Sequence, residues 1–306
     1  MLDICMLGTG GGVPVPERFL SAALIRYKGR KILIDCGEGS QVSMKILGWG
    51  FKTIDAICIT HAHGDHIIGL PGLLMTMANS GKKDPLTIVG PKGIEKVVEG
   101  LRVIAPDLPY QVNIVENPKK AISLLDEKGI VDVQALELDH SIACVGYSFN
   151  IKRNPKFDWE KATKNNVPKK LWSKLQTNDL VESDGKVYTS NMVLGEDREG
   201  LKISYITDTR PIDTIPKFID KSDLFICESN YGSDEDMGKA IKNKHMTFRE
   251  AATLAKKGNV EKLALTHFGP ALGVPKDYIE NAKEEFENTI IAEDRMEFTL
   301  NFKQNK

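Results

Sequence analysis

Residues 54–66 read Ile-Asp-Ala-Ile-Cys-Ile-Thr-His-Ala-His-Gly-Asp-His, an apolar run that ends in a dense group of metal-binding side chains. Three histidines and an aspartate follow Thr60 within six residues: His61, His63, Asp65 and His66. Imidazole and carboxylate are the ligands that zinc and similar divalent ions prefer. Burying four such groups without partners would be costly, so a purely structural role is disfavoured. The stretch therefore predicts a metal site at the end of a strand.

The spacing within this motif leaves two interpretations open. His61 and His63 are two residues apart, which suits a turn leaving a strand, where two rings converge on one ion. Asp65 and His66 are adjacent, so their side chains diverge. Either they serve a second metal, or one is a ligand and the other is a base.

Other metal-type residues also follow apolar runs directly, namely His140, Asp208 and His267. In an α/β protein the carboxyl ends of strands open onto one edge of the sheet, where sites collect. We therefore expect these residues to join the motif. For the remaining histidine, His245, which follows a charged loop, placement on the surface is an open alternative.

Seven ligands suffice for two metals if one carboxylate is shared. The expected first set is His61, His63 and His140; the second is Asp65, His66 and His267; Asp208 bridges them. Two ions that clamp a hydroxide suit hydrolysis of phosphodiesters, and also of amides and thioesters.

Composition limits the remaining possibilities. The 306 residues are 41% apolar and carry a net charge of −1, so binding to nucleic acid requires a local basic patch. Five cysteines occur without a C-x-x-C pair, which is typical of reduced thiols in a cytoplasmic protein. No apolar run approaches the length of a membrane span, so we expect a soluble protein without a membrane partner.

Alternating strands and helices, with no Ser/Gly linker, predict an α/β fold with a single domain over residues 1–306. Gly8–Gly12 is not a dinucleotide fingerprint, because Val13 and Pro14 stand where the motif and its helix should continue. We expect a loop that lines a cleft, or a tight turn. The predicted strands are 2–7, 21–27, 30–36, 86–89, 131–138, 143–151, 201–207, 223–227 and 261–266, and the helices 41–47, 69–77, 93–103 and 248–257.

Residues 152–174 carry eight basic and two acidic side chains, interleaved with Phe157, Trp159 and Trp172. Such a stretch suits a phosphate backbone and unstacked bases. The alternative is a solvated helix whose tryptophans pack inward.

The metal-type residues together resemble the ligand set of the metallo-β-lactamase superfamily. Within it, longer matches most resemble ribonuclease Z, the endonuclease that trims the 3′ trailer from precursor tRNA. These matches are residues 8–10, 35–39, 69–74, 90–94 and 208–211. The resemblance implies a four-layer αββα sandwich, two zinc ions per chain (with manganese or iron as other candidates), a homodimer and a precursor tRNA substrate.

The resemblance also implies roles. Asp65 would be both a ligand and the base that orients the attacking water. Glu228 stands at the glutamate of a His-Glu-Ala-Thr motif and His245 at the histidine of a His-Ser-Thr motif, so that His245 would protonate the departing oxygen. The insertion 152–196 corresponds to an arm that grips the tRNA elbow, usually on the partner subunit. Its candidate RNA contacts are Lys169, Lys170 and Trp172.

Departures from the family pattern leave two other functions open. Only the glutamate of the His-Glu-Ala-Thr motif is kept in residues 227–230, the arm's Gly-Pro turn is replaced in residues 167–172, and residues 268–272 lack a Ser and an Arg-Tyr pair. Phe19 replaces a common Asn. The alternatives are a hydrolase of a small phosphodiester or other ester, and a non-catalytic RNA-binding relative, although the complete ligand set argues against the latter.

Overall fold

The computed structural model describes residues 1–125 and 131–303. The chain divides into two compact units. The larger comprises residues 1–151 and 201–301, and the smaller comprises residues 152–200 with the C-terminal segment that begins at Phe302. Within the described ranges, no helix is long and apolar enough to cross a membrane.

The first sheet of the larger unit contains both antiparallel and parallel strands. Its described strands run in the order β16-β1-β2-β3-β4-β5-β6, with β3 to β6 parallel. Their bounds are β1 Leu2–Gly8, β2 Ala22–Tyr27, β3 Arg30–Ile34, β4 Ile54–Cys58, β5 Leu86–Gly90, β6 Val112–Glu116 and β16 Glu297–Leu300. The β2–β3 turn uses Lys28 and Gly29, both at positive φ, as the predicted hairpin requires.

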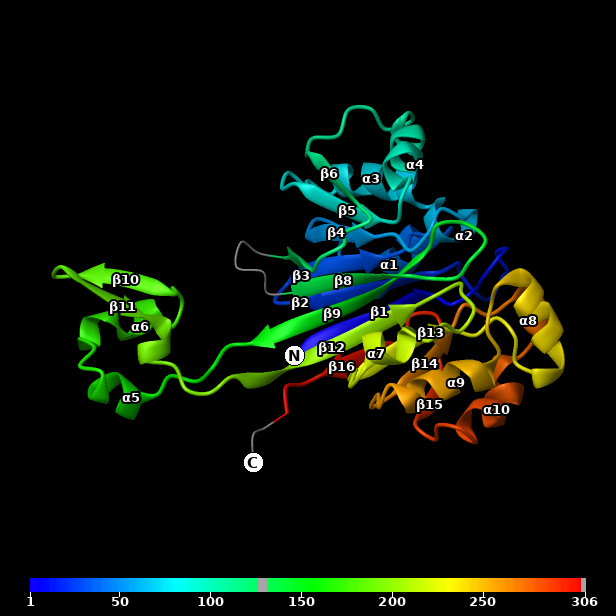
Figure 1. Ribbon diagram of the computed structural model, residues 1–306. Helices are drawn as coiled ribbons and strands as arrows, with labels where there is room; N and C mark the ends of the chain where they lie inside the picture. Colours follow the sequence, from blue (N-terminus) through cyan, green and yellow to red (C-terminus); the bar gives the residue numbers. More distant parts are fainter. Residues whose placement is uncertain (126–130, 304–306) are drawn as a thin grey trace. The chain divides into compact units, whose positions relative to one another are not determined.

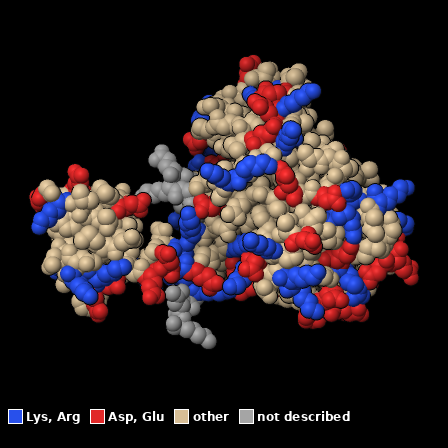
Figure 2. Space-filling view, in the orientation of Figure 1, with Lys and Arg blue, Asp and Glu red and all other residues tan. Residues whose placement is uncertain are grey.

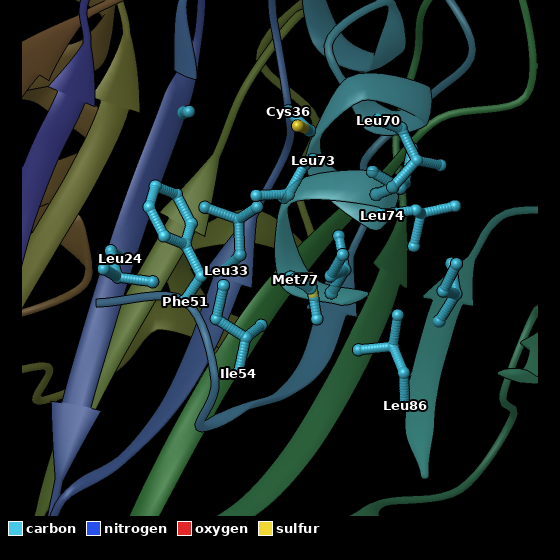
Figure 3. Close-up of a cluster of buried hydrophobic side chains, with 14 of the residues drawn as sticks. Leu24, Leu33, Cys36, Phe51, Ile54, Leu70, Leu73, Leu74, Met77 and Leu86 are labelled. Carbon is cyan, nitrogen blue, oxygen red and sulfur yellow. The ribbon is translucent and has the colours of Figure 1, made fainter. Parts of the chain in front are cut away.

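Three helices cover one face of this sheet: α1 (Ser40–Leu47), α3 (Leu70–Asn79) and α4 (Ile94–Arg102). Figure 3 shows Leu73 and Met77 of α3 packed over Leu33 and Phe51, which are buried in the same core. The face that α3 buries is therefore the Leu and Met side predicted from the sequence.

The second sheet runs in the order β15-β14-β13-β12-β9-β8-β7 among the described strands, with β12 to β15 parallel. Their bounds are β7 Ile122–Leu124, β8 Val131–Glu137, β9 Val145–Arg153, β12 Arg198–Ile206, β13 Leu224–Glu228, β14 Leu263–Thr266 and β15 Thr289–Ile291. Helices α7 (Ile215–Ile219), α9 (Phe248–Lys257) and α10 (Ile279–Lys283) pack on it. The capping box predicted for α9 is present between Thr247 and Glu250.

The two sheets face each other between the two helical layers (Figure 1), so the expected αββα sandwich is confirmed. Tyr147 of β9 lies in the interior between the sheets, and its hydroxyl donates to the carbonyl of Ile59, 2.7 Å away, just beyond β4. The parallel strands of both sheets end at a common edge. This edge positions the functional side chains.

The smaller unit has its own core, formed by Ala162, Leu171, Leu175 and Val193. It contains α5 (Trp159–Lys164), α6 (Trp172–Leu175) and the hairpin β10 (Leu180–Ser183) with β11 (Lys186–Thr189). The predicted arm, residues 152–196, falls inside this unit.

Candidate metal centre

The first group of converging donors comes from the 54–66 stretch and two other strand ends. Beyond β4 the chain turns into the short helix α2 (Gly64–Ile67), which brings His63 Nδ1 to 3.1 Å from His61 Nε2. His140, which follows β8, places Nε2 3.2 Å from the same His63 nitrogen. With Asp208 beyond β12, these donors lie within 4.8 Å of one another.

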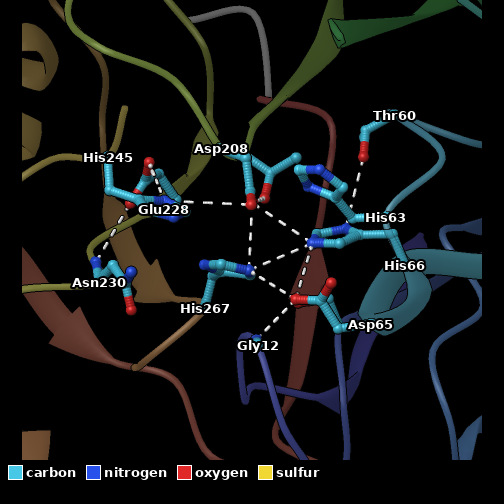
Figure 4. Close-up of polar contacts among 12 residues, drawn as sticks. Gly12, Thr60, His63, Asp65, His66, Asp208, Glu228, Asn230, His245 and His267 are labelled. Carbon is cyan, nitrogen blue, oxygen red and sulfur yellow. Dashed lines mark hydrogen bonds and ion pairs between the residues drawn. The ribbon is translucent and has the colours of Figure 1, made fainter. Parts of the chain in front are cut away.

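A second group lies beside the first. His66 Nε2 is 3.1 Å from Nε2 of His267, the residue after β14. Asp65 Oδ2 is 3.4 Å from the His66 nitrogen and 3.3 Å from the His267 nitrogen. The structure thus brings together all seven residues that the sequence proposed as ligands, in two groups. Figure 4 shows Asp208 beside the second group, formed with Asp65, His66 and His267.

Asp208 belongs to both groups, with one oxygen in each. Its Oδ2 lies 3.5 Å from His61 Nε2 and 3.8 Å from His140 Nε2. Its Oδ1 lies 3.3 Å from His66 Nε2 and 3.1 Å from His267 Nε2. This is the arrangement that a bridging carboxylate requires.

The donors fit divalent metal ions in spacing and in charge. A tetrahedral ion with ligand bonds of about 2.0–2.1 Å separates its ligands by about 3.3 Å, close to the separations observed here. Burial, with the neighbouring His66, lowers the pKa of His61 well below its usual range, which keeps a lone pair free for a metal. Burial opposes charge on Asp208, but the histidines around it outweigh burial and lower its pKa. Burial acts to lower the pKa of His66, but Asp208 and Asp35 outweigh it and raise that pKa, so a metal ion would displace a proton there. Imidazole nitrogens around an ionised carboxylate thus offer the donors of a cation site.

A second layer of polar groups orients these ligands. Asp35 is fully buried and adopts a left-handed backbone conformation at φ 55°. Its Oδ2 lies 2.8 Å from His66 Nδ1, and its Oδ1 accepts a hydrogen bond from the backbone N–H of Thr60 at 2.7 Å. Nδ1 of His140 lies 3.2 Å from the carbonyl oxygen of Lys244. Such contacts fix the ring so that the other nitrogen faces the converging donors, where a metal ion would be held. The sequence analysis assigned Asp35 no role, although its place at a strand end was the available signal.

Gly11 and Gly12 of the glycine-rich segment line this site. This is the first of the two alternatives expected from the sequence, a loop that lines a cleft. The backbone N–H of Gly12 donates to Asp65 Oδ2 at 2.6 Å. A Cβ atom on Gly11 would lie 2.4 Å from Cε1 of His267. Glycine is therefore required at position 11 by the close approach of the imidazole ring.

His245 lies against the metal groups rather than on the surface. Its side chain is 13% exposed, and Nδ1 is 3.1 Å from Oε1 of the fully buried Glu228, the last residue of β13. The other oxygen of Glu228 accepts from the backbone N–H of Asn230. Burial acts to lower the pKa of His245, but Glu228, together with Asp208 and Asp65, outweighs it and raises the pKa to about 9.

A cavity of about 390 Å³ opens over these groups. Its walls include Asp65, His140 and His245 from the centre, and Lys242 and Lys244 at and after the end of α8 (Met237–Asn243). A phosphate group can therefore reach both metal groups and His245 from one side.

The candidate RNA contacts of the smaller unit differ in exposure. Lys169 and Lys170 are exposed, and Lys170 pairs with Asp184 at 3.0 Å. Trp172 is half-buried: its indole N–H donates to the carbonyl of Val167, and its ring centre lies 5.0 Å from that of Phe157. Trp159, in contrast, is 63% exposed. Trp172 therefore fits the alternative in which the tryptophans of residues 152–174 pack inward. Trp159 instead leaves its ring accessible, as the RNA-binding alternative requires.

Comparison with solved structures defines the class of protein. The chain is similar to the metallo-beta-lactamase fold protein YhfI from Bacillus subtilis, with a TM-score of 0.70 at 19% identity, covering 97% of this chain and 98% of the other. It is also similar to human tRNase Z, short form, with a TM-score of 0.70 at 26% identity, covering 98% and 100%. The fold is therefore the metallo-β-lactamase fold.

Sequence comparison defines the family. The chain is 61% identical to ribonuclease Z of Clostridium beijerinckii, covering 100% of both chains, and 59% identical to that of Clostridioides difficile, covering 99% of both. A family model described as anti-Pycsar protein Apyc1 matches residues 2–101. The chain belongs to the ribonuclease Z family.

Proposed function

We propose that this chain is a metal-dependent endoribonuclease that removes the 3′ trailer from precursor tRNA. The observation that carries the proposal is the shared position of Asp208 between two donor groups, with the His245–Glu228 pair beside them. Its relatives over the full length are ribonuclease Z enzymes, and the human structural relative is a tRNase Z.

The seven ligands would hold two divalent ions per chain. Histidine nitrogens with aspartate oxygens favour zinc, and manganese or iron are the other candidates. Two such ions lower the pKa of water toward neutrality and stabilise charge on the attacking and leaving oxygens of a phosphodiester.

Two side chains would move the protons. Asp65, held by the backbone N–H of Gly12, orients the attacking water and accepts its proton at a carboxylate oxygen. As the water oxygen bonds to phosphorus, the bond from phosphorus to the departing ribose oxygen breaks. His245, bound to Glu228 through Nδ1, gives the proton on Nε2 to that oxygen.

The smaller unit would bind the RNA backbone through Lys169 and Lys170. Lys169 Nζ lies 5.9 Å from the centre of the Trp172 ring, so Trp172 supports this basic edge from the core of the unit. On the face seen in Figure 2, basic and acidic side chains are interspersed, which makes such local contacts more important than net charge.

The assembly would be a homodimer that forms through the exposed side of α1 and α3. Val42 and Ile46, one turn apart on α1, are 51% and 62% exposed, and Met75 on α3 is 39% exposed. Exposed apolar side chains on neighbouring helices are typical of an interface. The five buried free thiols suit the cytoplasm as the place of action.

The test is incubation with a precursor tRNA that carries a 3′ trailer, with bis(p-nitrophenyl) phosphate as a second substrate. We expect a cut at the base of the acceptor stem that a chelator abolishes and added zinc restores. Turnover of the small diester with the precursor left intact would instead identify a small-phosphodiester hydrolase. Binding of the precursor without cleavage of either substrate, with metal present, would identify a non-catalytic RNA-binding protein.

A further inference from the structure

The position of His245 depends on a very short link between two helices. Helix α8 ends at Asn243, Lys244 adopts a left-handed conformation at φ 62°, and α9 begins at Phe248. His245 lies in this link, and its backbone N–H donates to the carbonyl of Ala240. A link of this length does not by itself fix where an imidazole points.

The half-buried guanidinium of Arg210 contacts this link. Arg210 donates through Nη1 to the backbone carbonyl oxygen of His245 and, at 2.9 Å, to Oε2 of Glu250. Its Nη2 donates to Oε1 of the same carboxylate. The side chains of Arg210 and Glu250 are only 17% and 18% exposed. This is a bidentate pair with a third contact to the peptide that follows His245.

Glu250 is itself fixed at the start of α9. Its Oε2 accepts from the backbone N–H of Thr247 at 3.0 Å, and the Thr247 hydroxyl accepts from the backbone N–H of Glu250 at 3.3 Å. Arg210 therefore contacts the link at His245 directly and, through the capping carboxylate, at the first turn of α9.

The other end of Arg210 is anchored to the metal centre. Its backbone N–H donates to the carbonyl of Asp139 at 3.0 Å, and the backbone N–H of Asp139 donates to the Thr209 hydroxyl at 3.0 Å. Thr209 in turn donates its backbone N–H to Oε1 of Glu228, which is the partner of His245. The two residues that follow Asp208 thus contact both parts of the proton-donor pair. Thr209 binds the carboxylate of Glu228, and Arg210 binds the backbone of His245.

We propose that Arg210 is a positioning residue for the departing-oxygen step, which it serves by clamping the His245 backbone to the segment that carries Asp208. The inference rests on the proposed role of His245 as the proton donor. The rigid guanidinium fork is essential, because it reaches a carbonyl and both oxygens of a carboxylate at once. A lysine ammonium offers no such fork.

Two substrates with different leaving groups, precursor tRNA and bis(p-nitrophenyl) phosphate, distinguish a positioning role of Arg210 from a purely structural one. The ribose oxygen is a poor leaving group that needs a proton, whereas p-nitrophenolate departs readily without one. If Arg210→Met displaces His245, kcat on precursor tRNA should fall about 10–100-fold with KM unchanged. Turnover of bis(p-nitrophenyl) phosphate and the metal content should change by less than about threefold, because the metal ligands stay in place.

A double-mutant cycle provides the direct test. Because Arg210 acts through His245, adding Arg210→Met to His245→Ala should cause no further loss on precursor tRNA. Arg249→Met is the matched control: it removes an arginine in the first turn of α9, next to Glu250, that pairs with Asp234 and Glu284 at the surface. It should leave both activities unchanged. Independent, additive losses from Arg210→Met and His245→Ala would overturn the inference.

One further variant, Arg210→Lys, controls for loss of folding, and His245→Ala alone tests the proposed function. Arg210→Lys retains the charge beside Glu250, and its thermal unfolding should match that of the unmodified chain. It should still show the selective loss on precursor tRNA, whereas full activity would mean that charge alone suffices and would contradict the clamp. If His245→Ala itself is not selective for precursor tRNA, the proposed proton donor is wrong. Selectivity in His245→Ala without selectivity in either Arg210 variant would overturn only the clamp.

Discussion

Nδ1 of His245 lies 3.1 Å from Oε1 of Glu228, a carboxylate without exposed surface at the end of β13. Divalent ions would neutralise Asp208 and Asp65, so Glu228 is the carboxylate that keeps the proton on His245 in the loaded enzyme. A raised pKa means that the donor form is present below that pKa and is lost as pH rises through it.

Glu228→Gln should therefore move the alkaline limb of the kcat–pH profile to lower pH. Glu228 is the largest of the charges that raise the pKa of His245, so its removal should lower that pKa and reduce kcat on precursor tRNA at pH 8 several-fold. The acid limb should not move. A profile identical to that of the unmodified chain would show that Glu228 does not control the proton on His245.

Gly11→Ala should disrupt the second metal group. The new methyl group would lie 2.4 Å from Cε1 of His267, so the ring must leave its present position. We expect metal analysis to show a loss of about one ion per chain and kcat to fall about 10²-fold. Gly100→Ala, inside α4 with nothing within 4 Å of the added atom, is the matched control. It should retain full metal and activity and gain about 0.5–1 kcal/mol in stability. Full metal content in Gly11→Ala would contradict the assignment of His267.

Replacing Lys169 and Lys170 together by alanine should weaken cleavage of precursor tRNA and spare bis(p-nitrophenyl) phosphate. Each lost phosphate contact should also reduce the dependence of log KM on log salt by about one. The double variant Lys256→Ala/Lys257→Ala, on α9, is the control, with the same change of charge on the larger unit. Equal losses on both substrates would remove the RNA-binding role of the smaller unit.

The large elements and the candidate metal ligands could be predicted because each leaves a strong local signal. One histidine follows Thr60, two residues beyond the end of β4, and another follows Thr266, the last residue of β14. Helix α9 carries its capping box in the order Thr247, Glu250. Every helix and strand expected from the sequence is present in the structure, with ends displaced by a few residues. Shorter elements were missed, among them strands β6, β7, β10, β11, β15 and β16 and helices α5, α7, α8 and α10, because segments of three to seven residues carry little periodicity.

The supporting contacts could not be predicted, since they depend on side chains that meet only in the folded chain. Asp35 lies behind His66, and Arg210 reaches Glu250 across 40 positions of sequence. The required glycine at position 11 follows from the approach of His267, a residue more than 250 positions away. Trp172 illustrates the same limit, because the sequence could not distinguish an exposed ring from one packed on Phe157.

In the proposed mechanism Asp208 joins two ligand groups into one dinuclear centre. Elemental analysis at neutral pH tests this by counting the divalent ions per chain in the unmodified chain, Asp208→Ala and His245→Ala. We expect about two ions in the unmodified chain and in His245→Ala, and fewer than one in Asp208→Ala, because both groups lose a ligand. A single ion in the unmodified chain, or two ions retained by Asp208→Ala, would contradict this role of Asp208.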